Sequence, residues 1–305
     1  QPGAQLFMFM MGIFIAYGRQ KSFAEVIRRV FYLLMAAYLL NFIRLVLPFY
    51  CGWLPNEFLT GNNVVIDGHT PIRLLLTGDI LQLAAIAYFV CQGFMQLKQT
   101  FFALSAGIIL ILLVSPMLWP IQTKNPLLQN ILGLFNGLPP TVFFPVFPWL
   151  CYPVAGVLAG FLWQKYLTAS KTVAWLSSTV IIITAGLVLA TFEPVKWNSN
   201  FYRLGPGGTL FHLGAVMLWI ALFVWAAKKT PANAFFRLLS WLSNHITVVY
   251  FTQWILIMWL LPVFGYEQLS VSETLFTILL TSFISFSIPA LYNNIILSRK
   301  SGKNG

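Results

Sequence analysis

Nine apolar runs, each close to twenty residues long, dominate this sequence and restrict what it can fold into. They cover residues 4–18, 30–47, 73–94, 101–119, 144–163, 173–191, 209–227, 245–262 and 274–296. The hydrocarbon core of a bilayer is about 30 Å thick and takes about 20 helical residues to cross. The runs do not alternate polar with apolar residues, which favours helices over a β-barrel. The sequence therefore predicts an all-α fold: a polytopic integral membrane helical bundle of about nine transmembrane helices, in a single transmembrane domain over residues 1–305.

The composition excludes an ordinary water-soluble protein. Only 8% of the residues are charged and 59% are hydrophobic, whereas about 25% of a typical soluble domain is charged. The net charge of +11 comes with no basic stripe or recognition motif, so we predict no nucleic-acid partner. The three cysteines are far apart and the three histidines are scattered, so we predict neither a disulfide framework nor a metal site.

Basic residues alternate from one side of the runs to the other in a way that predicts the topology. Thirteen lie on the first side and five on the second, which holds Arg44, Arg73, Lys124, Lys196 and Arg203. Because cytoplasmic loops are enriched in Lys and Arg, we expect residue 1 outside and the C-terminus in the cytoplasm. The long outer connections are 48–72, 120–143 and 192–208, with tight turns expected at Leu138–Pro140 and Gly205–Gly208.

Polar side chains within the runs are costly in a bilayer and therefore mark candidate functional positions. Asp79 and Gln82 are three residues apart, as are Asn41 and Arg44 in the preceding run, so each pair shares a helical face. Counted from Arg73, Asp79 is expected roughly 9 Å below the outer boundary. Two compatible interpretations remain: an Arg44–Asp79 ion pair that fixes two helices, and a polar cavity that opens outward.

The histidines supply further candidates. His212 follows Gly208 on the outer part of its run, behind Arg203, where an imidazole can act as general acid or base. The alternative is a histidine that only packs between helices. His245 follows Ser243 and Asn244, which are expected to cap a helix start that can hold phosphate.

Four stretches in order resemble heparan-alpha-glucosaminide N-acetyltransferase-like proteins of the membrane acyltransferase superfamily. Residues 5–12, QLFMFMMG, resemble the LFxFxxG helix of that family, and residues 78–82, GDILQ, are similar to its GxLQR element. Residues 144–150, FPVFPWL, with Gly156 and Gly160, resemble the FPxxPWxxxxxxGxxxG helix. Residues 241–250, WLSNHITVVY, are similar to LGxNSLxxYxxH, the motif of a helix shared across membrane acyltransferases.

The resemblance, to bacterial members of the family, implies an enzyme of a bacterial inner membrane that transfers an acyl group, usually acetyl, from cytoplasmic acyl-CoA to a sugar or glycan on the other side. Acyl-CoA would be a co-substrate rather than a tightly bound cofactor. Basic residues on the inner side would bind the phosphates of CoA, or alternatively they only set the topology. The candidates for phosphate binding are Arg28, Arg29, Arg237 and His245. The acceptor would meet His212 and Asp79 as catalytic groups, with Arg44, Gln82, Arg203, Asn41 and Gln253 as substrate-binding groups.

Two departures from the family pattern leave alternatives open. The family's Asp-x-x-Arg-Gly element and catalytic histidine precede its LFxFxxG helix, so we expect a missing first helix, with ten or more helices in total, or altered chemistry. Gln253 stands where relatives often have histidine, and an amide does not shuttle a proton at neutral pH. The alternatives are a secondary transporter or exporter of a glycan or lipid-linked substrate, with Asp79 as its coupling site, and a non-catalytic relative. A homodimer is also left open.

Overall fold

The computed structural model describes residues 3–62, 64–137, 142–165, 171–230 and 233–301, and most of this part of the chain is helical. Within those ranges no β-strand forms, and the one extended pairing is an isolated bridge between Gly78 and Val142. The predicted all-α fold is confirmed. The predicted turn at Leu138–Pro140 lies outside the described residues.

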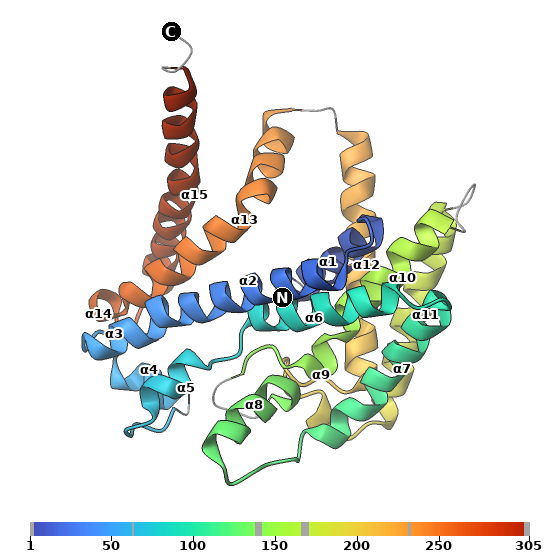
Figure 1. Ribbon diagram of the computed structural model, residues 1–305, viewed down its shortest axis with the longest axis horizontal. Helices are drawn as coiled ribbons and strands as arrows, with labels where there is room; N and C mark the ends of the chain where they lie inside the picture. The colour runs from blue at the N-terminus through green and yellow to red at the C-terminus, as the bar shows by residue number, and fades with distance from the viewer. Residues whose placement is uncertain (1–2, 63, 138–141, 166–170, 231–232, 302–305) are drawn as a thin grey trace. The chain divides into compact units, whose positions relative to one another are not determined.

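The chain forms two compact units (Figure 1), of which the first, unit 1, comprises Gln1–Ala37 and Leu76–Lys229. Its helices are α1 (Gly3–Tyr17), the first part of α2 (Phe23–Asn41), α6 (Ile80–Met95), α7 (Thr100–Leu118), α8 (Pro126–Asn136), α9 (Val146–Trp149), α10 (Cys151–Lys165), α11 (Lys171–Phe192), η2 (Val195–Trp197) and α12 (Pro206–Lys229).

The second, unit 2, comprises Tyr38–Leu75 and Thr230–Gly305. It holds the end of α2, η1 (Phe42–Val46), α3 (Leu47–Tyr50), α4 (Asn56–Gly61), α5 (Thr70–Leu75), α13 (Ala234–Trp259), α14 (Leu261–Phe264) and α15 (Val271–Ser301). Its core contains Leu45, Leu59 and Met258, and the indole of Trp259 donates a hydrogen bond to the Ile43 carbonyl at 2.9 Å.

Six helical segments of the described chain are long and apolar enough to cross a membrane. They are Phe23–Tyr50, Thr100–Leu118, Val146–Lys165, Thr172–Phe192, Pro206–Lys229 and Val271–Leu291, and α1 and α6 are shorter apolar helices. Eight of the nine predicted runs therefore coincide with apolar helices, and the ninth, 245–262, lies mostly in α13. The protein is a polytopic helical membrane protein, as the sequence predicted.

Three predicted boundaries are wrong. The run 73–94 is not one helix, because α5 ends at Leu75 and α6 begins at Ile80. Ser243 and Asn244 do not cap a helix, because α13 begins nine residues before Ser243, at Ala234, where the Asn233 side chain accepts a hydrogen bond from Phe236 N at 3.1 Å. Gly205–Gly208 is not a separate turn, because Pro206 already begins α12.

Helices α1 and α10 of unit 1 pack with their backbones in contact. A Cβ atom added at Gly12 would lie 2.0 Å from the Pro153 carbonyl oxygen, and one at Gly156 would lie 2.0 Å from the Phe9 carbonyl oxygen. Hydrocarbon tails are as apolar as leucine, so helices in a bilayer associate largely through such close packing at small residues. These glycines, both within the stretches that resemble the family, therefore hold α1 against α10.

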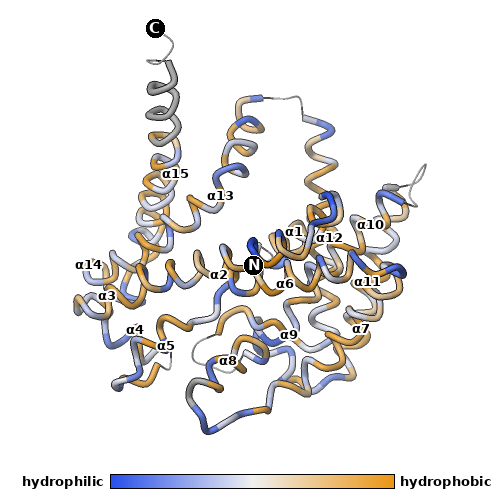
Figure 2. Tube along the Cα trace, in the orientation of Figure 1, coloured by the Kyte–Doolittle hydropathy of each residue, from blue (hydrophilic) through white to orange (hydrophobic). Residues whose placement is uncertain are grey.

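One end of unit 1 collects its basic residues. The Gln164 side chain donates to the Ala16 carbonyl at 3.2 Å and the Gln20 side chain donates to the Met95 carbonyl at 3.3 Å. These bonds bring together the ends of α1, α6 and α10. The basic residues at this end are Arg19, Lys21, Arg28, Arg29, Lys98, Lys165, Lys171, Lys228 and Lys229. Figure 2 shows hydrophilic residues concentrated at helix ends and connections. We call this the basic end of unit 1.

The α1–α10 contact can be tested with two glycine-to-alanine changes. Gly156→Ala is expected to lower the thermal unfolding temperature of the detergent-purified protein, because overpacking costs about 1–3 kcal/mol. Gly93→Ala in α6 is the matched control, because a Cβ there meets nothing within 4 Å, so this change should be neutral or slightly stabilising. Equal unfolding temperatures for both variants would contradict the packing argument.

Candidate functional site

The polar candidates of unit 1 gather at the end opposite its basic end, where two distant segments pair. The Phe143 backbone N–H donates to the Gly78 carbonyl at 3.0 Å, beside the bridge between Gly78 and Val142. A Cβ at Gly78 would lie 2.8 Å from Val142 Cγ1, so the close approach requires glycine here. This pairing joins the start of α6 to the segment that leads into α9 and α10.

Asp79 is the N-cap of α6. Its Oδ1 accepts a hydrogen bond from Ile80 N at 2.7 Å, and the Gln82 side chain accepts from Asp79 N at 3.0 Å, which closes a capping box. Gln82 also donates to the Thr77 carbonyl at 3.1 Å. The side chains of this box satisfy backbone groups at a helix end that would otherwise be costly to bury.

This geometry corrects the predicted depth of Asp79 inside a continuous helix. The backbone of Asp79 is extended, with φ −128° and ψ −178°, because a capping residue stands just outside its helix. Asp79 and Gln82 are both buried, at 4% and 1% exposed, and they meet through the capping box, so the prediction that they share a helical face is wrong. The α6 N-terminus also favours a negative charge nearby through the helix dipole.

Tyr202, which sequence reasoning missed, lies near Asp79. Burial raises the pKa of the Tyr202 hydroxyl above its ordinary value, and the charge of Asp79 adds to the effect. The Trp149 indole donates to the Tyr202 carbonyl at 3.0 Å, and the Tyr202 ring contacts those of Phe143 and Phe144. The sequence signal was the FPVFPWL stretch, whose aromatic residues surround this tyrosine.

His212 lies in the second turn of α12, half-buried beside the same aromatic group. Its ring is 5.8 Å from the ring of Phe201 and 5.7 Å from that of Phe211, edge-on in both cases. Phe201 in turn contacts Trp149 and Tyr202. The structure thus brings His212 and Asp79 to one corner of unit 1, on either side of the 201–202 segment.

Glu193, also missed, fixes the start of α12. Its two carboxylate oxygens accept from Gly207 N at 2.7 Å and from the Asn198 side chain at 3.0 Å. A carboxylate at a helix N-terminus satisfies an orphan N–H and complements the dipole. Glu193 at the end of α11 therefore sets the position of the turn that carries His212.

Arg203 is also part of this corner. Its guanidinium donates to the Gly137 carbonyl, and burial lowers the pKa of Arg203 below its ordinary value. The side chain therefore ties the 201–203 segment to the end of α8.

The remaining predicted substrate residues belong to unit 2. Arg44 lies in η1, where it donates to the Asn41 side chain at 2.9 Å and has its guanidinium carbon 4.8 Å from the centre of the Trp254 ring. The predicted Asn41–Arg44 neighbourhood is therefore present. Gln253 is partly buried on α13, next to Trp254. Arg44 and Asp79 fall in different units, so their ion pair stays a prediction.

Arg28 and Arg29 line a cavity at the basic end of unit 1. The cavity has a volume of about 580 Å³ and is completed by Lys21, Glu25, Tyr32 and Tyr88. Glu25 is already engaged: it pairs with Arg19 and accepts from Ser22 N at 2.9 Å, in a capping box that starts α2. Three cationic side chains thus line the cavity. Among the described lining residues the one carboxylate is that of Glu25, and it is already paired with Arg19.

The other two predicted phosphate-binding residues belong to unit 2. Arg237 is exposed on the first turn of α13. His245 lies inside that helix, where its Nδ1 is 2.8 Å from the Trp241 carbonyl oxygen and its ring stacks on the Trp241 indole. A residue eleven positions past the helix start does not share the anion-binding N–H groups of that start, so the helix-start argument for His245 is wrong.

Unit 1 of this helical membrane protein thus has a polar, aromatic corner at one end and a cationic cavity at the other. The family model for the heparan-alpha-glucosaminide N-acetyltransferase catalytic region matches residues 2–192. This is more than half of the chain, and the chain belongs to that family. It is an integral membrane protein of an acetyltransferase family. Neither the curated proteins nor the solved structures compared with it gave a match.

The capping role of Asp79 makes a testable prediction. Asp79→Ala is expected to destabilise the protein by about 0.5–2 kcal/mol, whereas Asp79→Asn should nearly retain stability, since asparagine caps helices as well as aspartate does. Thermal unfolding in detergent measures both. An alanine variant as stable as wild type would show that the cap contributes nothing.

Proposed function

We propose that this protein transfers an acetyl group from acyl-CoA to a hydroxyl or amine of a sugar or glycan on the opposite face of a bacterial inner membrane. The observation that carries the proposal is the family match over residues 2–192. It is supported by the chemical difference between the two ends of unit 1, one cationic and one polar and aromatic.

The orientation we propose has the basic end of unit 1 in the cytoplasm. Nine Lys and Arg residues at that end, against Lys124, Lys196 and Arg203 at the other, support it through the positive-inside rule. Cytoplasmic acyl-CoA would then approach the end that carries Lys21, Arg28 and Arg29. Their cavity suits phosphate oxygens, which arginine binds through paired N–H donors.

The acceptor would bind at the corner formed by Asp79, Tyr202, Arg203 and His212. His212 would accept the proton of the attacking hydroxyl or amine as the new bond to the thioester carbonyl carbon forms. The carbon–sulfur bond then breaks, and the CoA sulfur leaves as a thiolate that takes up a proton. The Tyr202 hydroxyl is an O–H donor and the Arg203 guanidinium is an N–H donor, and both suit an oxyanion.

The reaction itself is tested on the full-length protein in detergent or proteoliposomes, with labelled acetyl-CoA and a panel of sugars and glycans. Label in the acceptor supports the proposal. Protein that binds no CoA and acetylates nothing overturns it, and substrate uptake without acetyl transfer would favour the transporter hypothesis instead.

The base is tested by His212→Gln. A positioned general base contributes typically about 10²–10⁴-fold, so kcat/KM for the acceptor is expected to fall by that factor. Trp219→Leu, two turns further along α12 and 44% exposed, should keep activity near wild type. Asp79→Asn separates charge from capping: stability stays while activity falls if the carboxylate takes part. Full activity in His212→Gln would rule out the assigned role.

The donor cavity is tested by Arg28→Ala and Arg29→Ala. A hydrogen bond to a charged group contributes about 1.5–3 kcal/mol, so the KM for acetyl-CoA should rise about tenfold or more. The rise in KM should be smaller when the same variants are assayed with dephospho-CoA thioesters, which lack one phosphate. Lys124→Ala, at the opposite end of unit 1, is the charge-matched control. An unchanged KM in both arginine variants would place the phosphates elsewhere.

A further inference from the structure

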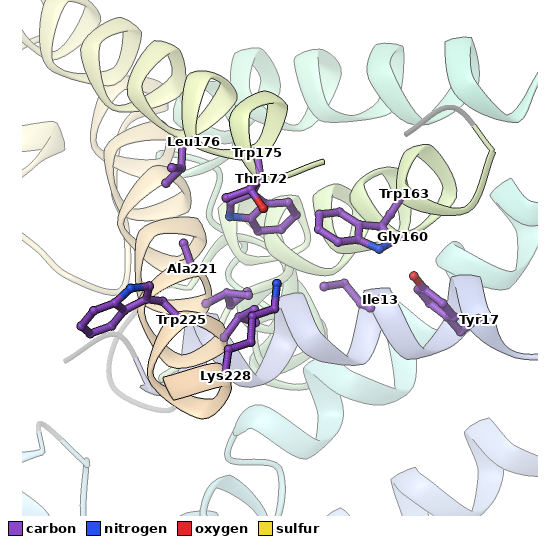
Figure 3. A pocket seen from close by; sticks show the side chains of 12 residues that line it. Ile13, Tyr17, Gly160, Trp163, Thr172, Trp175, Leu176, Ala221, Trp225 and Lys228 are labelled. Atoms are coloured by element: carbon purple, nitrogen blue, oxygen red, sulfur yellow. The ribbon is translucent and has the colours of Figure 1, made fainter. Parts of the chain in front are cut away.

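A second cavity lies at the basic end of unit 1, separate from the one that holds Arg28 and Arg29. It has a volume of about 240 Å³ and is lined from α1, α10, α11 and α12. Its walls are largely apolar, with Ile13, Trp163, Trp175, Leu176 and Trp225 among them (Figure 3). No residue of the proposed donor or acceptor sites lines it.

One charged group lines this cavity among the described residues, and it is a cation. Lys228, near the end of α12, has its ammonium directed toward the rings of Trp175 and Trp163 in Figure 3. The lining described contains no carboxylate to neutralise it. The cavity therefore combines largely apolar walls with one cation, which suits an amphiphile with a negative head.

The Trp175 side chain, which lines the cavity, is held in place by its contacts. The Trp175 indole donates to the Met217 carbonyl at 2.9 Å, and its ring contacts the edges of Trp163 at 5.7 Å and Phe9 at 6.3 Å. A separate apolar cavity, of about 260 Å³, also has Trp175 in its wall. Trp175 thus lines both apolar cavities.

The volume of the cavity lined by Lys228 limits the size of the ligand that can occupy it. An apolar cavity of about 150 Å³ holds one benzene molecule, so about 240 Å³ takes a segment of one alkyl chain and not a two-chain lipid. Tryptophan and tyrosine are enriched at the level of lipid headgroups, and basic pockets between transmembrane helices bind anionic headgroups. Tyr17, Trp225 and Lys228, which all line the cavity, match that combination.

We propose that this cavity is a binding site for an anionic phospholipid of the membrane, with one acyl chain against Trp163 and Trp175 and the headgroup phosphate at Lys228. The site goes beyond the proposed acetyl transfer and does not depend on it. Binding would fill the space between α1, α10, α11 and α12 near their ends.

The test measures lipid binding to the full chain in neutral detergent, by native mass spectrometry and by the shift in unfolding temperature. Phosphatidylglycerol and phosphatidylcholine with identical chains are compared. One Lys near a membrane surface contributes about fivefold in affinity for anionic lipid, so Lys228→Gln should lower the preference for phosphatidylglycerol by about that factor. Lys229→Gln, which does not line the cavity, is the matched control and should leave the preference unchanged.

Two further variants test the apolar part. Ala221→Phe fills the cavity and should abolish retention of both lipids, and Trp175→Ala removes the side chain that the two cavities share and should increase the retention of longer chains. Equal binding of both lipids with no effect of Lys228→Gln would overturn the proposal, since the cavity would then hold any hydrocarbon. Displacement of the lipid by acetyl-CoA would also overturn it, because the cavity would then belong to the donor.

Discussion

The contact between the backbones of α1 and α10 is the constraint on which the rest of unit 1 depends. Gly12 and Gly156 let the two helices approach until a Cβ on either would overlap a carbonyl oxygen of the other helix. Since a bilayer offers no hydrophobic force to drive helices together, this fit at small residues supplies much of the association. The FPVFPWL stretch, which includes Trp149, leads into α10 at the polar corner, and Gln164 near the other end of α10 lies at the basic end.

Much of the fold could be predicted from the sequence because a bilayer imposes helix length and polarity directly. Two of the three boundaries that failed did so where a polar side chain caps the start of a helix. Asp79 was expected inside a span because the apolar run continues on both sides of it, yet its side chain caps α6. Asn233 likewise begins α13 well before the apolar run at 245, because residues 234–244 are helical without being uniformly apolar. Hydropathy therefore predicts which residues lie in the bilayer, whereas the capping residues determine where each helix begins.

The candidate site was predicted in part. Asp79, Gln82, Arg203 and His212 lie at one end of unit 1, as the topology of the runs implied. Tyr202 and Glu193 were missed, because a tyrosine or a glutamate in a connection carries no local pattern until the chain is folded around it. Trp149 lies within the FPVFPWL stretch. Its hydrogen bond to the Tyr202 carbonyl joins residues 53 apart, so no local sequence pattern could predict it.

The corner is assembled from two parts of the chain with different relations to the family. The pairing of Gly78 with Val142 and the cap at Asp79 fall inside residues 2–192, whereas Tyr202, Arg203 and His212 follow that region. The α1–α10 contact lies wholly within the matched region, so replacement of the 195–212 segment would leave it intact. A change confined to this one short connection would therefore alter the corner and leave the scaffold that supports it in place.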